Sequence, residues 1–444
     1  MRNDKPCNVH TNNGNTLLIG AATSGCGKTT LTMGLLRALR DRGLQVQPFK
    51  CGPDYIDPLY HHQAAGTESV NLDTFMSSET HVRQLLAHYG GPADVRIIEG
   101  AMGLFDGYHG PRGSAAEVAL LTDVPVVLLV SARATAYSVA PLIYGFRQFQ
   151  PKLRLQGVVF NFVASDSQYA TLRQACEDAG AECLGYLPRN AALNIPARHL
   201  GLTIEGRQQA ERLITLAAHE VSSHVDIDRL LTPSSYAPLS PASSVPPPPS
   251  VSLQIAVAHD EAFNFTYRAN IDALRQWGHV DFFSPLRDAK LPSCDLLYLP
   301  GGYPEFFAAD LSANESMRHN ILSFAERGGR VLAECGGFMY LCRDIDGVPM
   351  CGVLPFSATM SGAHLHLGYR QMTAGQTTFR GHEFHYSSII TDNSPLPPSI
   401  ERLTLQQSAI GTPVDTPLYK YKNVVAGYTH WYWAESSPEE LWNI

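Results

Sequence analysis

Apolar and polar residues follow two rhythms in the first half of the chain. Short apolar runs are typical of strands buried on both faces, and they occur at Thr16–Ile19, Arg96–Ile98, Val124–Val130 and Gly157–Phe160. Between them, apolar residues recur every three or four positions, as expected for helices. In Thr29–Arg40, which ends before Gly43, one helical stripe would carry Leu31, Leu35, Leu36 and Leu39.

The second half repeats this alternation. Strands are predicted at Leu253–Ala258, Asp295–Leu299 and Arg330–Ala333, and helices at Asn270–Gln276 and Met317–Arg327. Strands that alternate with helices imply doubly wound α/β sheets, whose ligands bind at the carboxyl ends of the strands.

A Pro- and Ser-rich segment, Thr232–Ser252, separates the two halves. It lacks apolar periodicity, and such segments act as semi-rigid spacers. We therefore expect a first domain over residues 1–231, a linker over 232–252 and a second domain over 253–444. A long internal loop is the alternative.

Composition narrows the function classes. The chain of 444 residues is 44% hydrophobic and 17% charged, with a net charge of −8 and no basic block, so neither nucleic acid nor an acidic membrane is expected as a partner. The longest aliphatic run is too short to span a membrane. Met1–Asn15 lacks the apolar core of a signal peptide. The nine cysteines have no metal-binding spacing, so a reducing cytoplasmic setting is expected, with any reactive cysteine catalytic.

A phosphate-binding loop is predicted after the first strand. Gly25 and Gly27 would let backbone amides approach phosphate oxygens, Lys28 would reach the terminal phosphates, and the hydroxyl of Thr29 could bind magnesium; Thr30 completes the run. Ala22 stands where the strict P-loop pattern has its first glycine. A chance glycine turn is the alternative.

Acidic residues follow two of the extended segments. Asp54 and Asp57 come after Lys50 in a Gly- and Pro-containing loop, and Glu99 and Asp106 follow the strand at Arg96–Ile98. We expect Asp54 and Glu99 to bind magnesium beside the phosphate loop, whereas loop hydrogen bonding is an equal alternative for Asp57 and Asp106. These features predict magnesium-nucleotide chemistry but do not separate a ligase from a motor or a switch.

A candidate nucleophile lies in the second half. Cys335 follows a strand and precedes two glycines and a helix, which is the pattern of a nucleophile elbow. The helix terminus is expected to lower the pKa of the thiol. His430 is the leading candidate base, with His382 and His385 as alternatives, and the amides of Gly301 and Gly302 could stabilise an oxyanion. A buried structural cysteine is the alternative for Cys335.

Eight segments give the chain a resemblance to the cobyrinate a,c-diamide synthase family along nearly its whole length. They are SGCGKTT from Ser24, KCGPDYIDP from Lys50, EGAMGLFDG from Glu99, ARHLGL from Ala197, DEAFNF from Asp260, PGGYPE from Pro300, AECGGFMYL from Ala333 and RGHEFHYS from Arg380. The resemblance implies a P-loop domain like that of dethiobiotin synthetase, followed by a class I glutamine amidotransferase domain.

The resemblance also implies a reaction. Cys335 would attack glutamine and release ammonia, while ATP at Lys28 and Thr29 would phosphorylate the a and c acetate carboxylates of cobyrinate in cobalamin biosynthesis. Ammonia would then displace phosphate. By the same resemblance, magnesium lies near Asp54 and Glu99, Asp57 and Asp106 join the acyl-phosphate site, and Asn161 contacts adenine. A homodimer is the candidate assembly.

Two alternatives stay open, and the chain departs from the wider amidotransferase pattern at one position. The same amidation could act on nickel-sirohydrochlorin or hydrogenobyrinate. The first domain could instead be a nucleotide-dependent switch, although a switch would not need a cysteine on a glycine elbow. Finally, Tyr432 stands where classical class I glutaminases have a glutamate, so the resemblance implies a Cys335–His430 dyad.

Overall fold

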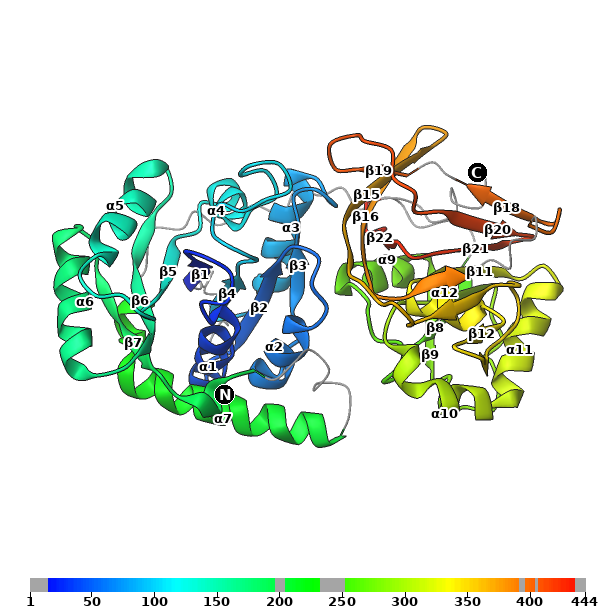
Figure 1. The fold of residues 1–444 in the computed structure, drawn as a ribbon, viewed down its shortest axis with the longest axis horizontal. Coiled ribbons are helices and arrows are strands. Elements are labelled where there is room, and N and C mark those ends of the chain that lie inside the picture. Colours follow the sequence, from blue (N-terminus) through cyan, green and yellow to red (C-terminus); the bar gives the residue numbers. More distant parts are fainter. Residues whose placement is uncertain (1–14, 196–203, 232–251, 391–395, 404–405, 436–444) are drawn as a thin grey trace, which may run out of the picture. The chain divides into compact units, whose positions relative to one another are not determined.

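The computed structural model describes residues 15–195, 204–231, 252–390, 396–403 and 406–435 (Figure 1). By its internal contacts the chain divides into two compact units. The second unit contains the C-terminal part from Ser243 and also residues Asp73–His81, and the first contains nearly all of the rest. The predicted linker lies, except for Ser252, outside the described residues, as does the ARHLGL segment. The predicted domain limits therefore stay a prediction.

The first unit is built on a seven-stranded parallel sheet with the order β3-β2-β4-β1-β5-β6-β7. Its strands are β1 (Asn15–Ala21), β2 (Val46–Cys51), β3 (Val70–Leu72), β4 (Val95–Glu99), β5 (Val126–Ser131), β6 (Leu155–Val163) and β7 (Cys183–Pro188). The helices that connect and flank these strands are α1 (Lys28–Asp41), α2 (Asp57–Ala65), α3 (Glu79–Gly90), α4 (Ala115–Thr122), α5 (Val139–Phe149), α6 (Asp166–Asp178), α7 (Ile204–His224) and α8 (Ile227–Leu230).

Helix α1 packs as its apolar stripe predicts. The four leucines of the stripe are fully buried, in one core cluster with residues of β1 and α7. Gly34 allows a close helix contact, because a Cβ there would lie 2.7 Å from the carbonyl oxygen of Ala217 in α7. This packing holds the N-terminus of α1 at the carboxyl end of β1, where a parallel sheet binds its ligands.

The second unit has a seven-stranded sheet with the order β18-β20-β21-β11-β10-β8-β9. The five strands from β21 to β9 are parallel, and β20 and β18 add antiparallel pairs at one edge. The strands are β8 (Leu253–Ala258), β9 (Gly278–Phe283), β10 (Leu296–Leu299), β11 (Arg330–Glu334), β18 (Ile400–Leu403), β20 (Leu418–Tyr421) and β21 (Val424–Gly427). The α-helices are α9 (Arg268–Trp277), α10 (Ala308–Ala313), α11 (Glu315–Glu326) and α12 (Gly336–Leu341).

Two four-stranded sheets accompany the central one. The order β13-β12-β14-β17 joins β12 (Asp344–Ile345), β13 (Val348–Pro349), β14 (Ser357–Thr359) and β17 (Ser388–Ile390). The order β19-β15-β16-β22 joins β15 (His366–Ala374), β16 (Thr377–His385), β19 (Gln407–Ser408) and β22 (His430–Tyr432). This second sheet was not predicted from the sequence pattern. In it, His382 of β16 lies opposite His430 of β22.

Among the described residues, no helix combines the length and the apolar character needed to cross a membrane. No disulfide joins any of the eight cysteines in the described part of the chain.

Candidate functional site

The loop between β1 and α1 has the backbone conformation that its glycines predict. Gly25 and Gly27 adopt φ angles of +73° and +91°, which are unfavourable for residues with a side chain. A Cβ at Gly27 would also lie 2.2 Å from Nδ2 of Asn161. Both the backbone angle and the neighbouring side chain therefore require glycine at position 27.

Asn161 supports this loop from β6. Its buried side-chain amide donates a hydrogen bond to the carbonyl oxygen of Cys26 at 2.7 Å, and its Oδ1 accepts one from the backbone amide of Phe162 at 2.7 Å. In this structure the side chain fixes the backbone ahead of α1. Its expected contact with adenine stays a prediction.

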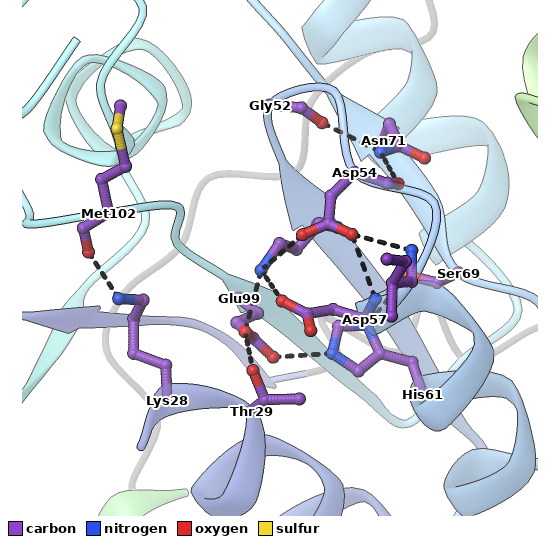
Figure 2. Close-up of polar contacts among 12 residues, drawn as sticks. Lys28, Thr29, Gly52, Asp54, Asp57, His61, Ser69, Asn71, Glu99 and Met102 are labelled. Atoms are coloured by element: carbon purple, nitrogen blue, oxygen red, sulfur yellow. Dashed lines mark hydrogen bonds and ion pairs between the residues drawn. The ribbon is translucent and has the colours of Figure 1, made fainter. Parts of the chain in front are cut away.

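The first residues of α1 bring the candidate phosphate ligands to the end of β4. Lys28 is 8% exposed, and its ammonium donates to the carbonyl oxygen of Met102 (Figure 2). Burial lowers the pKa of Lys28, and the charge of Glu99 partly offsets this effect. The hydroxyl of Thr29 donates to Oε1 of Glu99 at 2.9 Å, while Thr30 is buried in the same turn.

Lys50, at the end of β2, gathers the acidic residues. Its Nζ lies 2.9 Å from Oε1 of Glu99 and 3.6 Å from Oδ2 of Asp54, and it also contacts Asp57. The side chain is only 3% exposed. Burial opposes the charge on this ammonium, but the three carboxylates outweigh it and hold its pKa well above the usual value. Lys50 was not among the predicted site residues, although it stands beside Asp54 and Asp57 in the sequence.

Glu99 is the centre of the network in Figure 2. Its carboxylate is fully buried, and Oε2 lies 2.7 Å from Nε2 of His61, whose Nδ1 lies 3.1 Å from the hydroxyl of Ser69. Burial alone would raise the pKa of Glu99, but the charge of Lys50 and the hydrogen bond from His61 hold it well below the usual value. His61 was not predicted as a site residue, although its position four residues after Asp57 places both residues on the same face of a helix.

The other predicted acidic residues, Asp54 and Asp106, make different contacts. Oδ1 of Asp54 accepts the backbone amides of Ile56 and Asp57, so this residue both fixes the chain at the start of α2 and faces Lys50. Asp106 instead closes its own loop, because its Oδ2 accepts the amide of Gly103 at 2.9 Å. The structure therefore brings Asp54, Asp57 and Glu99 together around Lys50 and leaves Asp106 in a local turn.

This donor set fits magnesium. A hydroxyl and carboxylates supply the oxygen ligands that Mg²⁺ prefers, and Oε1 of Glu99 already contacts both Thr29 and the cationic Lys50. The carboxylates converge next to the loop that is expected to hold phosphates, where a bound Mg²⁺ would balance the phosphate charge.

In the second unit, Cys335 occupies a strained turn between β11 and α12. Its φ of +47° is rare for a residue with a side chain and agrees with a nucleophile elbow. The following glycine is required by close packing, because a Cβ on Gly336 would lie 2.9 Å from the backbone nitrogen of Gly302. This contact brings one predicted oxyanion amide next to the elbow.

The expected lowering of the thiol pKa is wrong for this structure. Burial raises the pKa of Cys335, and the charge of Glu305 adds to the effect, while the backbone amide of Gly336 opposes it only in part. The side chain is 3% exposed, and α12 has only six residues. Before substrate binds, the cysteine is therefore a neutral thiol that needs a base.

His430 lies against the other glycine of the predicted oxyanion site. A Cβ on Gly301 would approach Cε1 of His430 to 2.2 Å, so the imidazole packs on the glycine backbone. Burial lowers the pKa of His430 well below its usual value, and the nearby His382 and His385 lower it further. The ring is therefore neutral near pH 7 and can accept a proton.

The alternative histidines have other surroundings. His382 stacks on His430 with 4.9 Å between ring centroids, and its Nδ1 lies 2.9 Å from the hydroxyl of Tyr267. His385 contacts Glu383 through Nε2 and the carbonyl oxygen of Ser387 through Nδ1. Both nitrogens of His385 thus face acceptors, which favours His430 over His385 as the base.

Buried polar side chains fix the strand that carries His430. Oε1 of Glu334, the residue before Cys335, accepts the backbone amide of Trp431 at 3.1 Å. Asn270 donates to the carbonyl oxygen of Trp431 and accepts the amide of Trp433, both at 2.8 Å. These bonds hold β22 beside β11, and sequence analysis missed both Glu334 and Asn270.

Two family models match the chain. The model of a CobQ/CobB/MinD/ParA nucleotide binding domain matches residues 17–202, and the model of a CobB/CobQ-like glutamine amidotransferase domain matches residues 254–438.

Curated relatives match most of the chain. The cobyrinate a,c-diamide synthase of Listeria monocytogenes is 38% identical over 94% of this chain and 96% of its own. The hydrogenobyrinate a,c-diamide synthase of Mycobacterium bovis is 40% identical over 85% of this chain and 87% of its own. The hydrogenobyrinate a,c-diamide synthase of Brucella abortus is 40% identical over 84% of this chain and 89% of its own. Among solved structures, the MinD cell division protein of Aquifex aeolicus covers 47% of this chain and 97% of its own, with 13% identity and a TM-score of 0.33.

Proposed function

The chain belongs to the family of cobyrinate and hydrogenobyrinate a,c-diamide synthases, and from this premise we propose that it amidates the a and c acetate groups of a corrin precursor, using ATP and glutamine-derived ammonia. The matched models confirm the predicted fold class, a P-loop domain followed by a glutamine amidotransferase domain. The observation that carries the proposal is the presence in one chain of a phosphate loop facing the Glu99 cluster and a cysteine elbow flanked by Gly302.

Glutamine hydrolysis is assigned to the second unit. His430 takes the proton of the Cys335 thiol as sulfur adds to the side-chain amide carbon of glutamine. The backbone amides of Gly301 and Gly302 stabilise the oxyanion. Collapse of the adduct expels ammonia, with His430 returning the proton, and water then hydrolyses the glutamyl thioester. Because thiol and imidazole both start neutral, proton transfer accompanies the attack.

Carboxylate activation is assigned to the first unit. The loop amides and Lys28 hold the phosphates of ATP, and an acetate oxygen of the corrin attacks the γ-phosphorus with release of ADP. Lys50 and the first turn of α2 lie beside this site, where the ammonium can balance the charge of the acyl phosphate. Ammonia then adds to the acyl carbon and phosphate leaves.

Mg²⁺ bound by Thr29, Glu99 and Asp54 would neutralise phosphate charge during transfer. Asp57 contacts Lys50 and is assigned to the same site. Asp106 is assigned to shaping the loop after β4.

The corrin itself has two candidates, because relatives of both names match the chain at similar identity. Both names specify the same a,c-diamidation. Cobyrinate is placed first, since the Listeria relative matches the larger share of the chain.

The test is a mass-spectrometric assay of the purified protein with magnesium-ATP, glutamine and one acceptor at a time. Cobyrinate, hydrogenobyrinate and nickel-sirohydrochlorin are the acceptors. We expect two successive conversions of carboxylate to amide that require both ATP and glutamine. Turnover of nickel-sirohydrochlorin alone would assign the protein to a different biosynthetic pathway. Inactivity on all three acceptors would contradict the substrate assignment.

A further inference from the structure

A buried histidine outside the predicted site holds the far side of the Glu99 carboxylate. His61 lies on α2, is 0% exposed, and places Nε2 2.7 Å from Oε2 of Glu99 (Figure 2). Its other ring nitrogen lies 3.1 Å from the hydroxyl of Ser69, which precedes β3. Three segments of the first unit thus meet in one chain of hydrogen bonds.

The direction of the hydrogen bond to Glu99 follows from its chemistry. An ionised carboxylate can only accept, so Nε2 of His61 carries the hydrogen. This holds for both the neutral and the charged ring. Ser69 can accept from Nδ1 or donate to it and therefore fits either form. The support for Glu99 does not depend on the protonation of His61.

The two oxygens of Glu99 have different partners. Oε1 accepts from the hydroxyl of Thr29 and the ammonium of Lys50, both of which face the phosphate loop or the acidic cluster. Oε2 accepts from His61, on the side away from those groups. The terminal torsion of a glutamate has a broad energy profile, so a carboxylate keeps one orientation only when neighbours hold it.

We propose that His61 is a positioning residue that locks the Glu99 carboxylate with Oε1 toward Thr29 and Lys50, as a preformed ligand for magnesium-ATP. This inference rests on the proposed function of the first unit. When Thr29 turns its hydroxyl toward a metal, Oε1 loses one donor, but the bond from His61 to Oε2 keeps the carboxylate in place. Outer hydrogen bonds of this kind are worth roughly 10–100-fold in metal affinity or activity.

The chain offers a matched control and a conservative replacement. His62 is the next residue of α2 and is exposed, so His62→Ala removes an imidazole from the same helix without touching Glu99. His61→Gln retains an N–H donor near the position of Nε2, whereas His61→Ala removes it. Comparison of these variants separates the hydrogen bond from the packing of the ring.

The experiment measures metal binding directly. Mn²⁺ is titrated into each full-length variant with ADP, and free Mn²⁺ is followed by electron paramagnetic resonance. The Mg²⁺ concentration for half-maximal ammonia-dependent amidation is measured in parallel. We expect His61→Ala to weaken both by roughly 10–100-fold, with a smaller effect on the rate at saturating Mg²⁺. His61→Gln should recover most of the affinity, and His62→Ala should match the wild type.

The outcomes distinguish this inference from the proposed function. Unchanged Mn²⁺ affinity in His61→Ala would overturn the positioning role. Equal losses in the Ala and Gln variants, with equally lowered melting temperatures, would also overturn it, because they would indicate packing alone. If the wild type binds Mn²⁺–ADP with an affinity that His61→Ala weakens and His61→Gln recovers, but amidates no corrin, the inference stands and the substrate assignment fails.

Discussion

Lys50 is the residue whose loss should destabilise the first unit most directly. Its buried ammonium balances Asp54, Asp57 and Glu99, and removal of one partner from a buried ion cluster typically costs about 3–5 kcal/mol. We expect Lys50→Met to lower the free energy of unfolding of this unit by that amount. Urea unfolding of the variant and the wild type measures the difference.

Arg42→Met is the control for Lys50→Met. The ion pair of Arg42 with Asp228 is exposed, and pairs of this kind contribute no more than about 1 kcal/mol. Equal losses in the two variants would contradict the structural importance of the buried cluster.

Glu334 predicts a pH-dependent stability in the second unit. Its carboxyl is fully buried, and burial raises its pKa from the usual 4.5 to about 8, despite hydrogen bonds from Tyr298 and Trp431. A raised folded-state pKa gives stability that is full below the unfolded value and is lost as pH rises toward 8. The wild type should therefore lose stability relative to Glu334→Gln, by at most about 1.4 kcal/mol per pH unit.

Urea unfolding of the wild type and Glu334→Gln at pH 5 and at pH 8 tests this. The difference in unfolding free energy should move in favour of the Gln variant at the higher pH. A difference that is the same at both pH values would show that Glu334 keeps an ordinary pKa.

Single residues differ in how far the sequence predicts them. Lys28, Thr29 and Cys335 stand in short local patterns at predicted junctions of a strand and a helix. Lys28 and Thr29 begin α1, and Cys335 lies directly before α12. His61, Asn270 and Glu334 act through partners that are 38, 161 and 97 residues away in the chain. No local pattern encodes such a pairing, so these residues were missed.

At the scale of elements, the loop after β10 sets the place of His430. A side chain at position 301 would come within 2.2 Å of the imidazole, so Gly301→Ala should push the ring away from the elbow. A displacement of about 1 Å at a reacting group can cost roughly 100-fold in rate. We expect a loss of that order in glutamine hydrolysis, with amidation from added ammonia retained.

Gly145→Ala is the matched control for Gly301→Ala. This helical glycine has an ordinary φ and no atom within 4 Å of an added Cβ, so its replacement should leave both activities unchanged. Steady-state assays with glutamine and with ammonia compare the two variants. Normal glutamine hydrolysis in Gly301→Ala would contradict the assigned place of His430.

Element prediction succeeded where burial is complete and failed where it is partial. The strands β1, β4, β5 and β8 are mostly buried, and all were predicted within two residues. The hairpin of β15 and β16 carries many half-exposed and polar residues, so its sequence lacks clear alternation. Its pairing with β22 depends on contacts distant in sequence, and the antiparallel sheet was therefore not predicted.

At the scale of the whole molecule, the division into two α/β units follows from the repeated alternation of strands and helices on both sides of the Pro-rich segment. Each unit has its own seven-stranded central sheet, and each has its own hydrophobic core. The two proposed reactions use different units, so their chemical steps should be separable by mutation.

Cys335→Ser tests this separation. Serine has nearly the shape of cysteine but is a poorer nucleophile, and removal of a catalytic nucleophile typically costs far more than about 1000-fold. We expect glutamine-dependent amidation to fall by at least that factor, while amidation from added ammonia and its ATP requirement persist. Cys342→Ser is the control, since Cys342 is buried in the same unit and its thiol donates to the carbonyl oxygen of Phe338 at 3.4 Å. Loss of ammonia-dependent activity in Cys335→Ser would show that the units do not act separately. Retained glutamine use would exclude Cys335 as the nucleophile. A rate of ATP hydrolysis that is unchanged by glutamine, ammonia and corrin would favour the nucleotide switch as the function of the first unit.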